Sequence, residues 1–219
     1  MTSLEENREK KRKEKLPDKP AKSAGISINP DNRVLLCGKT GSGKSTLAEF
    51  LLMPIERLIV IDGKDGLQSW TLEDYSKSKH FNKIKNNEAL RVRIVDKADT
   101  LDVLKECYEV GNIMIYIDEI TASIPPLSKP DDIYVDIWTR GRQRKIGAWG
   151  ASQRPKQIPL FFFTEAEHIF MFRLSMEADR KRVAESAGSR VLVNPVDRFG
   201  FYYYNVNDDK LRYFKRLNI

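Results

Sequence analysis

Short apolar runs recur along this chain from Asn32 onward, and each is bounded by polar or glycine-rich turns. Their length is that of β-strands, and most of them lack the alternating polar positions of a half-buried strand. Such continuous apolar runs are typical of a sheet that is covered on both faces. Strands are expected on this basis at 33–37, 57–62, 91–96, 112–119, 146–153 and 168–174.

Helical periodicity occupies several of the segments between these strands. One face of 99–110 carries Leu101 and Leu104 with Cys107 or Tyr108, which is the spacing of one side of a helix. Strands that alternate with helices predict an α/β fold, with a mostly parallel sheet flanked by helices and joined by right-handed crossovers. Helices are expected at 44–52, at 99–110, at 131–144 with a weak point at Gly141, and at 176–188.

The two ends of the chain differ from this central pattern. Residues 1–24 combine dense mixed charge with two prolines and no apolar period. We therefore expect a disordered arm, which either only aids solubility or contacts nucleic acid or a protein partner. Residues 199–216 predict a small β-hairpin that turns at 207–209, as a C-terminal β extension. The expected organisation is one domain over 25–219 with its core at 32–190.

The composition excludes several classes of protein. A chain of 219 residues with 41% hydrophobic and 32% charged residues is long enough for one well-packed α/β domain. No apolar run reaches the roughly 18–20 residues of a membrane span, and the polar N-terminus carries no secretory signal. We therefore expect a cytoplasmic protein without direct membrane insertion, in which Cys37 and Cys107 are reduced thiols.

The charge of the chain favours a polyanionic partner. The formal net charge is +7, and residues 1–24, with 8 basic and 5 acidic side chains, contribute less than half of it. The rest of the chain is therefore also basic, which is typical of proteins that bind nucleic acid.

The glycine-rich segment after the first strand matches G-x-x-x-x-G-K-[ST], the phosphate-binding P-loop. It follows an apolar strand and opens a helix, which is the context that this motif requires. Its glycines let backbone N–H groups turn toward a phosphate, and the helix N-terminus adds partial positive charge. Lys44 is expected to reach the β- and γ-phosphates of ATP, and the Ser45 hydroxyl to ligate Mg²⁺. The nucleotide-binding residues are expected to be Gly38, Lys39, Thr40, Gly41, Ser42, Gly43, Lys44, Ser45 and Thr46.

Two acidic residues end the apolar run at 112–119. Asp118 is expected at the carboxyl edge of the sheet, where a carboxylate can hold Mg²⁺ through a bound water. Glu119 follows directly and is expected to be the catalytic carboxylate that polarises the attacking water. The pair indicates hydrolysis rather than a nucleotide switch. The sequence has neither the Asn-Lys-x-Asp motif of guanine recognition nor an LSGGQ-like transporter signature.

Four segments in order resemble the FtsK/HerA superfamily of hexameric DNA-pumping ATPases. They are LCGKTGSGKST, VIDGKDGLQSW, IYIDEI and GRQRKIGAWGASQRP, and the likeness spans residues 32–190. The Asp-x-Lys element of that superfamily is matched by Asp62 and Lys64, and its Gln-Arg-Pro element by residues 153–155. The resemblance implies a RecA-like P-loop NTPase core, ATP and Mg²⁺ as cofactors, and a homo-oligomeric ring, which is a hexamer in that superfamily.

The resemblance also implies a role for Gln153. In that superfamily the strand before this residue lies between the P-loop strand and the Asp-Glu strand, which would bring Gln153 beside Lys44 and Glu119. Its amide is then expected to hydrogen-bond the γ-phosphate or the attacking water. Pro155 would end the strand, while Arg154 stays open between contact with DNA, with a neighbouring subunit and with the fold itself.

The length of the chain indicates which members of the superfamily it resembles most. A motor of this size without a membrane anchor or a winged-helix domain is similar to the minimal genome-packaging ATPases of tailless icosahedral viruses with an internal membrane. The implied function is Mg-ATP-driven translocation of double-stranded DNA into a preformed viral capsid. A capsid vertex or portal protein would be a further partner, and the host cytoplasm or the virion packaging vertex would be the place of action.

A cluster of basic residues without any acidic side chain covers 137–164. Ring ATPases complete their sites with an arginine from a neighbouring subunit, so one of Arg140, Arg142 and Arg144 is expected to be a catalytic finger in trans. The alternative is that all three bind carboxylates or DNA phosphate.

Contact with DNA is expected to be made through its phosphate backbone, because a motor must pass any base sequence. Two polar loops are candidates for this contact, one at 121–132 through Lys129 and one at 154–164 through Lys156.

Two other functions stay open at this point. One is an assembly or secretion ATPase that resembles the zonula-occludens-toxin-like factors, and the other is a P-loop phosphotransferase. Turnover that is stimulated by DNA would be expected of the DNA motor alone.

Overall fold

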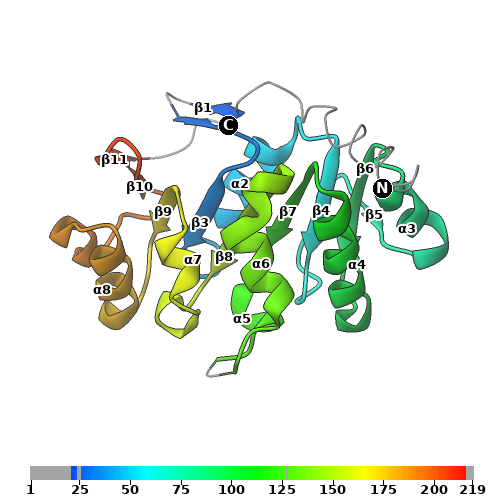
Figure 1. Ribbon diagram of the computed structural model, residues 1–219. Helices are drawn as coiled ribbons and strands as arrows, with labels where there is room; N and C mark the ends of the chain where they lie inside the picture. Colours follow the sequence, from blue (N-terminus) through cyan, green and yellow to red (C-terminus); the bar gives the residue numbers. More distant parts are fainter. Residues whose placement is uncertain (1–20, 24–25, 127, 216–219) are drawn as a thin grey trace.

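The computed structural model describes residues 21–23, 26–126 and 128–215. Within them, nine strands form one twisted sheet in the order β11-β10-β9-β3-β8-β7-β4-β6-β5 (Figure 1). The strands are β3 (Arg33–Cys37), β4 (Arg57–Ile61), β5 (Glu73–Asp74), β6 (Leu90–Ile94), β7 (Ile113–Ile117), β8 (Ile146–Ser152), β9 (His168–Phe172), β10 (Phe201–Asn205) and β11 (Lys210–Phe214).

The seven strands from β9 to β5 in this order run parallel, whereas β10 and β11 add to β9 in antiparallel fashion. The predicted α/β fold with a mostly parallel sheet and a C-terminal β extension is therefore confirmed. The central strands β3, β4, β7, β8 and β9 are buried at every position, because helices or loops cover both of their faces.

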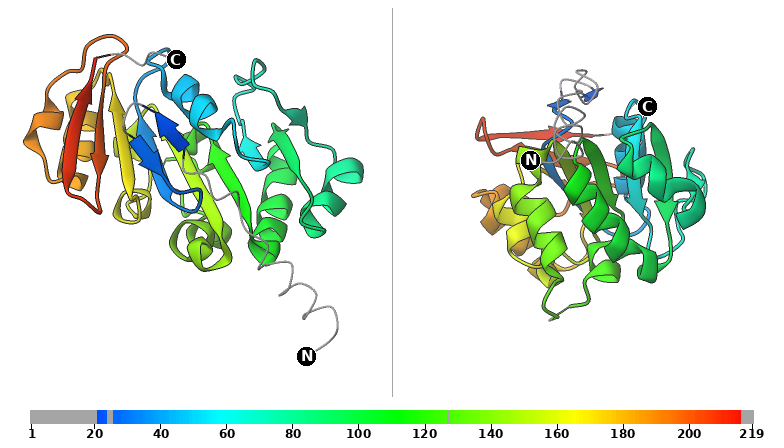
Figure 2. Two further views of the ribbon diagram at one scale, coloured as in Figure 1. Left: turned by 90° about the horizontal axis from the view of Figure 1, so that it is seen from above. Right: turned by 45° about the vertical axis from the view of Figure 1, so that its right-hand side comes forward.

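The helices divide unequally between the two faces of the sheet (Figure 2). On one face α2 packs through its leucines against apolar side chains of β3, β4 and β8. The opposite face is covered by α4, α6, α7 and α8, with α3 near its edge. The bounds are α2 (Lys44–Leu52), α3 (Lys77–Lys85), α4 (Lys97–Val110), α5 (Ile120–Ser123), α6 (Asp132–Arg140), α7 (Phe161–Thr164) and α8 (Glu177–Ser186).

Some elements differ from the expectation. The helix expected over 131–144 ends at Arg140, because Gly141–Arg144 tightens into a 3-10 turn. Ala21–Ser23 was expected to belong to a disordered arm, but it forms β1 and pairs with β2 (Ile26–Ile28). The rest of the expected arm, residues 1–20 and 24, lies outside the described residues.

Several elements were not expected from the apolar pattern, among them β2, β5, α3, α5 and α7. β5 is only two residues long, and α3 buries just His80 and Ile84 among polar residues, so neither has a recognisable period. α7 is a single turn. Among the residues that the structure describes, no helix combines the length and the apolar character that crossing a bilayer requires.

Candidate nucleotide-binding and hydrolysis site

The P-loop connects β3 to α2 at the carboxyl edge of the sheet. Its start is fixed on both sides, because Gly38 N donates to Ser152 O at the end of β8 at 3.0 Å and Lys39 N donates to Arg173 O after β9 at 2.9 Å. Gly43, directly before α2, has a φ of 105°, a conformation that a residue with a Cβ rarely adopts. The backbone of the loop thus takes the turn that the motif predicted.

Lys44 is the first residue of α2, and only 6% of it is exposed. Its Nζ donates to Lys39 O at 3.2 Å, so the side chain lies back along the loop. Burial lowers the pKa of Lys44, while the nearby carboxylates of Glu119 and Asp118 raise it. An ammonium group held in the loop with acidic neighbours is suited to bind phosphate oxygens.

Ser45 and Asp118 meet beside the loop, although 73 positions separate them in the sequence. Ser45 Oγ donates to Asp118 Oδ1 at 2.9 Å, and the Tyr116 hydroxyl donates to the same oxygen at 2.8 Å. Burial raises the pKa of Asp118, and the hydrogen bonds from Tyr116 and Ser45 lower it. A hydroxyl and a carboxylate that converge next to a phosphate loop fit Mg²⁺, which prefers oxygen ligands and keeps several waters.

Glu119 follows Asp118 and is buried, with 2% of it exposed. Its carboxylate accepts three kinds of hydrogen bond: from Gln153 N at 3.2 Å, from Thr121 Oγ1 at 2.9 Å and from Lys64 Nζ at 3.4 Å. These donors fix the orientation of the carboxylate. Glu119 is therefore a preorganised candidate for a base that accepts a proton from water.

Gln153 lies between the P-loop and Glu119. β8 is placed between β3 and β7 in the sheet, as the resemblance implied, so the residue after β8 emerges between the two functional strands. Gln153 Oε1 accepts a hydrogen bond from Thr40 Oγ1 at 2.9 Å, and Gln153 N donates to Glu119. The amide thus contacts the phosphate loop, while the backbone contacts the carboxylate.

Asp62 and Lys64, the Asp-x-Lys pair, have different environments. Asp62 is fully buried and accepts hydrogen bonds from Gly66 N at 3.0 Å and Leu67 N at 2.8 Å. It therefore shapes the turn that follows β4. Lys64 is half exposed and reaches Glu119, so only the lysine joins the site.

The three candidate finger arginines do not join the site of their own chain. The 3-10 turn Gly141–Arg144 leads directly into β8, while Gln153 follows the end of that strand. Seven strand residues span about 20 Å, so the arginines lie at the opposite edge of the sheet. Arg140 pairs with Asp136 at 3.1 Å and Arg142 with Glu167 at 2.9 Å. Arg144 donates to Tyr108 O at 3.1 Å and lies over the Tyr108 ring.

The two candidate DNA loops lie at the carboxyl edge, on the side of the P-loop. Lys129 is exposed and has an ion pair with Asp132 at 3.7 Å. Lys156 is exposed as well. Nothing in these contacts prevents either lysine from reaching a polyanion.

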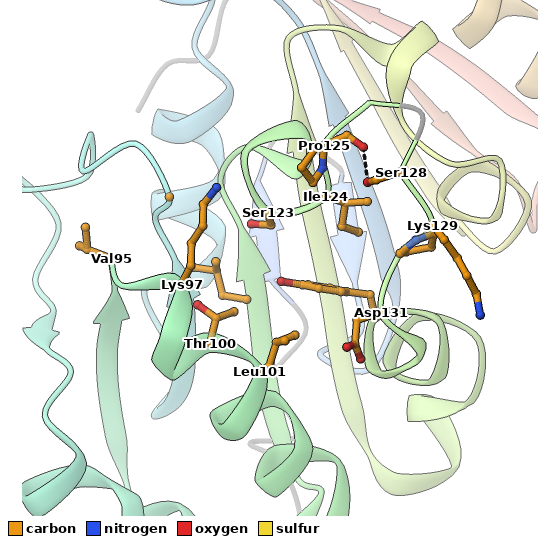
Figure 3. Close-up of a pocket in the computed structure, with 14 residues that line it drawn as sticks. Val95, Lys97, Thr100, Leu101, Ser123, Ile124, Pro125, Ser128, Lys129 and Asp131 are labelled. Atoms are coloured by element: carbon orange, nitrogen blue, oxygen red, sulfur yellow. Dashed lines mark hydrogen bonds between the residues drawn. The ribbon is translucent and has the colours of Figure 1, made fainter.

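A cavity of about 240 Å³ opens at the same edge, between the start of α4 and the segment from α5 to α6 (Figure 3). Its lining is mainly apolar and includes Leu101, Ile124 and Tyr134. No P-loop residue lines it, and neither do Asp118, Glu119 or Gln153. The cavity is therefore separate from the site just described.

Sequence reasoning missed three residues of this neighbourhood. Tyr116 reads as part of an apolar strand, Thr121 as a loop residue and Asp179 as one of many charges on a polar helix. A tyrosine two positions before the aspartate does share its side of the strand, which was the available signal for Tyr116. Asp179, which accepts a hydrogen bond from Arg154 Nε at 3.0 Å, had no such signal, because this contact depends on how α8 packs.

Comparisons with known proteins show what the chain is similar to. The chain is 28% identical over 166 residues to the DNA packaging ATPase P9 of Enterobacteria phage PRD1, covering 71% of this chain and 70% of that protein. No protein-family model matches the chain.

Solved structures share the fold. The genome packaging NTPase B204 of Sulfolobus turreted icosahedral virus 2, in complex with AMPPCP, superposes with a TM-score of 0.72 at 18% identity, covering 87% of this chain and all of B204. The conjugation coupling protein TcpA of pCW3 gives a TM-score of 0.61 at 16% identity, covering 89% of this chain and 63% of TcpA. The fold is that of a P-loop NTPase, and the resemblance to packaging ATPases expected from the sequence is confirmed.

Proposed function

We propose that this protein is a Mg-ATP-driven translocase of double-stranded DNA that packages a viral genome into a preformed capsid. The observation that carries the proposal is the contact of Glu119 with Gln153 beside the P-loop, in a chain similar to a phage DNA packaging ATPase. That contact brings a candidate base and a candidate γ-phosphate sensor to one point. A P-loop used only for binding would need neither.

The residues of the site have separate roles in hydrolysis. The P-loop backbone and Lys44 would bind the triphosphate, and Ser45 and Asp118 would hold Mg²⁺, which would supply positive charge to neutralise the phosphates. Glu119 accepts the proton of the water that attacks the γ-phosphorus, and the bond to the β-phosphate oxygen breaks to leave ADP and phosphate. Gln153 hydrogen-bonds the γ-phosphate or the attacking water and loses this partner on hydrolysis.

We further propose that subunits assemble into a ring, a hexamer by resemblance, in which one of Arg140, Arg142 and Arg144 completes a neighbour's site. Their position about 20 Å from their own P-loop supports action in trans. Arg140 fits best, because 70% of its side chain is exposed and its ion-pair partner Asp136 belongs to the same helix, α6. Arg142 and Arg144 are engaged more closely by the fold.

The DNA contact is proposed at the loops that carry Lys129 and Lys156, through the phosphate backbone. Their place at the carboxyl edge supports this, since changes at the γ-phosphate occur at that edge. A capsid vertex or portal protein would hold the ring, in the host cytoplasm or in the virion.

ATP turnover with and without duplex DNA, at several salt concentrations, tests the proposal. We expect stimulation by DNA that falls steeply with salt, because backbone binding releases counterions. Lys44→Ala should abolish turnover, and Gln153→Ala should bind ATP but hydrolyse it slowly. Turnover that is unaffected by DNA and by Arg140→Ala, Arg142→Ala and Arg144→Ala would contradict the motor and favour a secretion ATPase.

A further inference from the structure

We propose that Asp179 is a positioning residue for hydrolysis, which acts on Gln153 through Arg154. This inference rests on the proposed ATPase activity. The resemblance gave Arg154 no defined role, and it assigned none to Asp179, which belongs to α8. The structure joins the two residues.

Asp179 holds the Gln-Arg-Pro turn with both of its carboxylate oxygens. Oδ2 accepts a hydrogen bond from Arg154 Nε at 3.0 Å, and Oδ1 accepts one from Lys156 N at 3.0 Å. The two donors lie on either side of Pro155. One side chain thus fixes the chain before and after the proline, directly after the sensor residue.

The burial of Asp179 shows that this contact is not an incidental surface ion pair. Its side chain is 2% exposed, whereas that of Arg154 is 42% exposed. A buried carboxylate is retained only where donors replace its lost hydration. Its charge is also close enough to Cys37, the last residue before the P-loop, to add to the effect of burial in raising the pKa of that thiol.

Gln153 is consequently held from both directions. On one side Gln153 N donates to Glu119, and Gln153 Oε1 accepts from Thr40. On the other side Arg154 N donates to Ser152 Oγ at 3.1 Å, while the Arg154 side chain is held by Asp179. Release of the Arg154 side chain would remove the link between Asp179 and the residue directly after Gln153, and would so loosen the backbone that positions the amide. A displacement of about 1 Å at a reacting group can cost as much as 100-fold in rate.

The test measures kcat and KM for ATP in Asp179→Asn and Arg154→Gln. We expect kcat to fall about 10- to 100-fold in each, while KM changes less than about threefold, because the P-loop and Lys44 are unaltered. The double variant should be no slower than the slower single variant, because both substitutions break the same contact between Arg154 and Asp179. Glu177→Gln is the matched control: Glu177 is also on the first turn of α8, but it is exposed and paired with Lys181, so its kcat should stay at the wild-type value.

Different outcomes overturn the inference. Wild-type kcat in Arg154→Gln, or losses that multiply in the double variant, would show that Asp179 does not act through Arg154. A loss of DNA stimulation in Arg154→Gln with normal basal turnover would assign the arginine to DNA instead. If Asp179→Asn does not fold, Arg154→Gln still tests the inference, because Arg154 is half exposed and its substitution is less disruptive. Thermal melting checks that Arg154→Gln is folded. Absence of ATPase activity in the wild-type protein would refute the proposed function itself, which keeps the two failures distinct.

Discussion

At the scale of single residues, the Tyr116 hydroxyl has the most specific unexplored contact. It donates to Asp118 Oδ1, and its ring stacks on Trp70 with a centroid distance of 5.4 Å. Burial raises the pKa of Tyr116 well above its ordinary value, so the hydroxyl keeps its proton and can only donate to the carboxylate. Tyr116→Phe removes this hydrogen bond and keeps the ring. We expect the Mg²⁺ concentration for half-maximal turnover to rise about 10-fold, as for other groups that orient metal ligands.

Equilibrium binding of Mn²⁺ in the presence of an ATP analogue, followed by electron paramagnetic resonance, checks the same effect without turnover. Tyr134→Phe is the matched control, because Tyr134 is a buried tyrosine that lines the separate cavity. Equal metal affinity in wild type and Tyr116→Phe would contradict a positioning role for the hydroxyl.

The sequence predicted those residues of the candidate site whose type and spacing define a motif. The P-loop, Asp118 and Glu119 belong to this group, because their chemistry depends on local strand-to-turn geometry. The Asp179 carboxylate depends instead on packing between distant segments, so its contact with Arg154 cannot be read from a single stretch of sequence. Tyr116 and Asp118 are only two positions apart, but the apolar run around Tyr116 predicts a buried strand and does not show that its hydroxyl donates to the carboxylate.

At the scale of elements, the neighbours of β8 approach it so closely that one of its positions has room only for glycine. A Cβ on Gly147 would lie 2.0 Å from Pro30 O and 2.5 Å from Met114 Cε. Because Pro30 contributes a backbone oxygen, little can give way. Gly147→Ala should therefore lower the free energy of unfolding by about 1–3 kcal/mol, as measured by denaturant titration.

Gly66→Ala is the matched control for this change. A Cβ there would have no atom within 4 Å, and the φ of Gly66 is not positive. It should leave stability within about 0.5 kcal/mol of wild type. Equal effects of the two substitutions on the free energy of unfolding would show that the close approach of Pro30 and Met114 does not require a glycine at position 147.

The extent of burial explains which elements could be predicted from the sequence. β3, β4, β7 and β9 are continuous apolar runs, because both faces of each are buried, and the sequence pattern located them within a residue or two. β5 and α3 bury few side chains, so they leave almost no period. The order of the strands required the family resemblance, since apolar runs do not specify neighbours.

At the scale of the whole molecule, a buried polar group couples stability to pH. His168 begins β9, and the sequence assigned it no role. Its ring contacts the Tyr203 hydroxyl at 2.8 Å and Asn32 Oδ1 at 3.1 Å, which connects β9 to β10 and to the start of β3. Burial lowers the pKa of His168 from 6.5 to about 4. The folded protein therefore keeps this imidazole neutral at pH values where an unfolded chain would protonate it.

The sign of the pH effect follows from proton binding. Between pH 6.5 and about 4, the unfolded chain binds a proton at His168 that the folded chain does not, so stability falls as the pH falls. The contribution is complete above the unfolded pKa and amounts to at most about 3 kcal/mol. We expect denaturant midpoints of the wild-type protein to decline across this range and those of His168→Gln to decline less. Parallel curves for the two proteins would show that another group, such as a paired carboxylate, causes the acid sensitivity. A smaller slope in the variant would identify His168 as a site where acid destabilises the junction between the parallel core and its antiparallel extension.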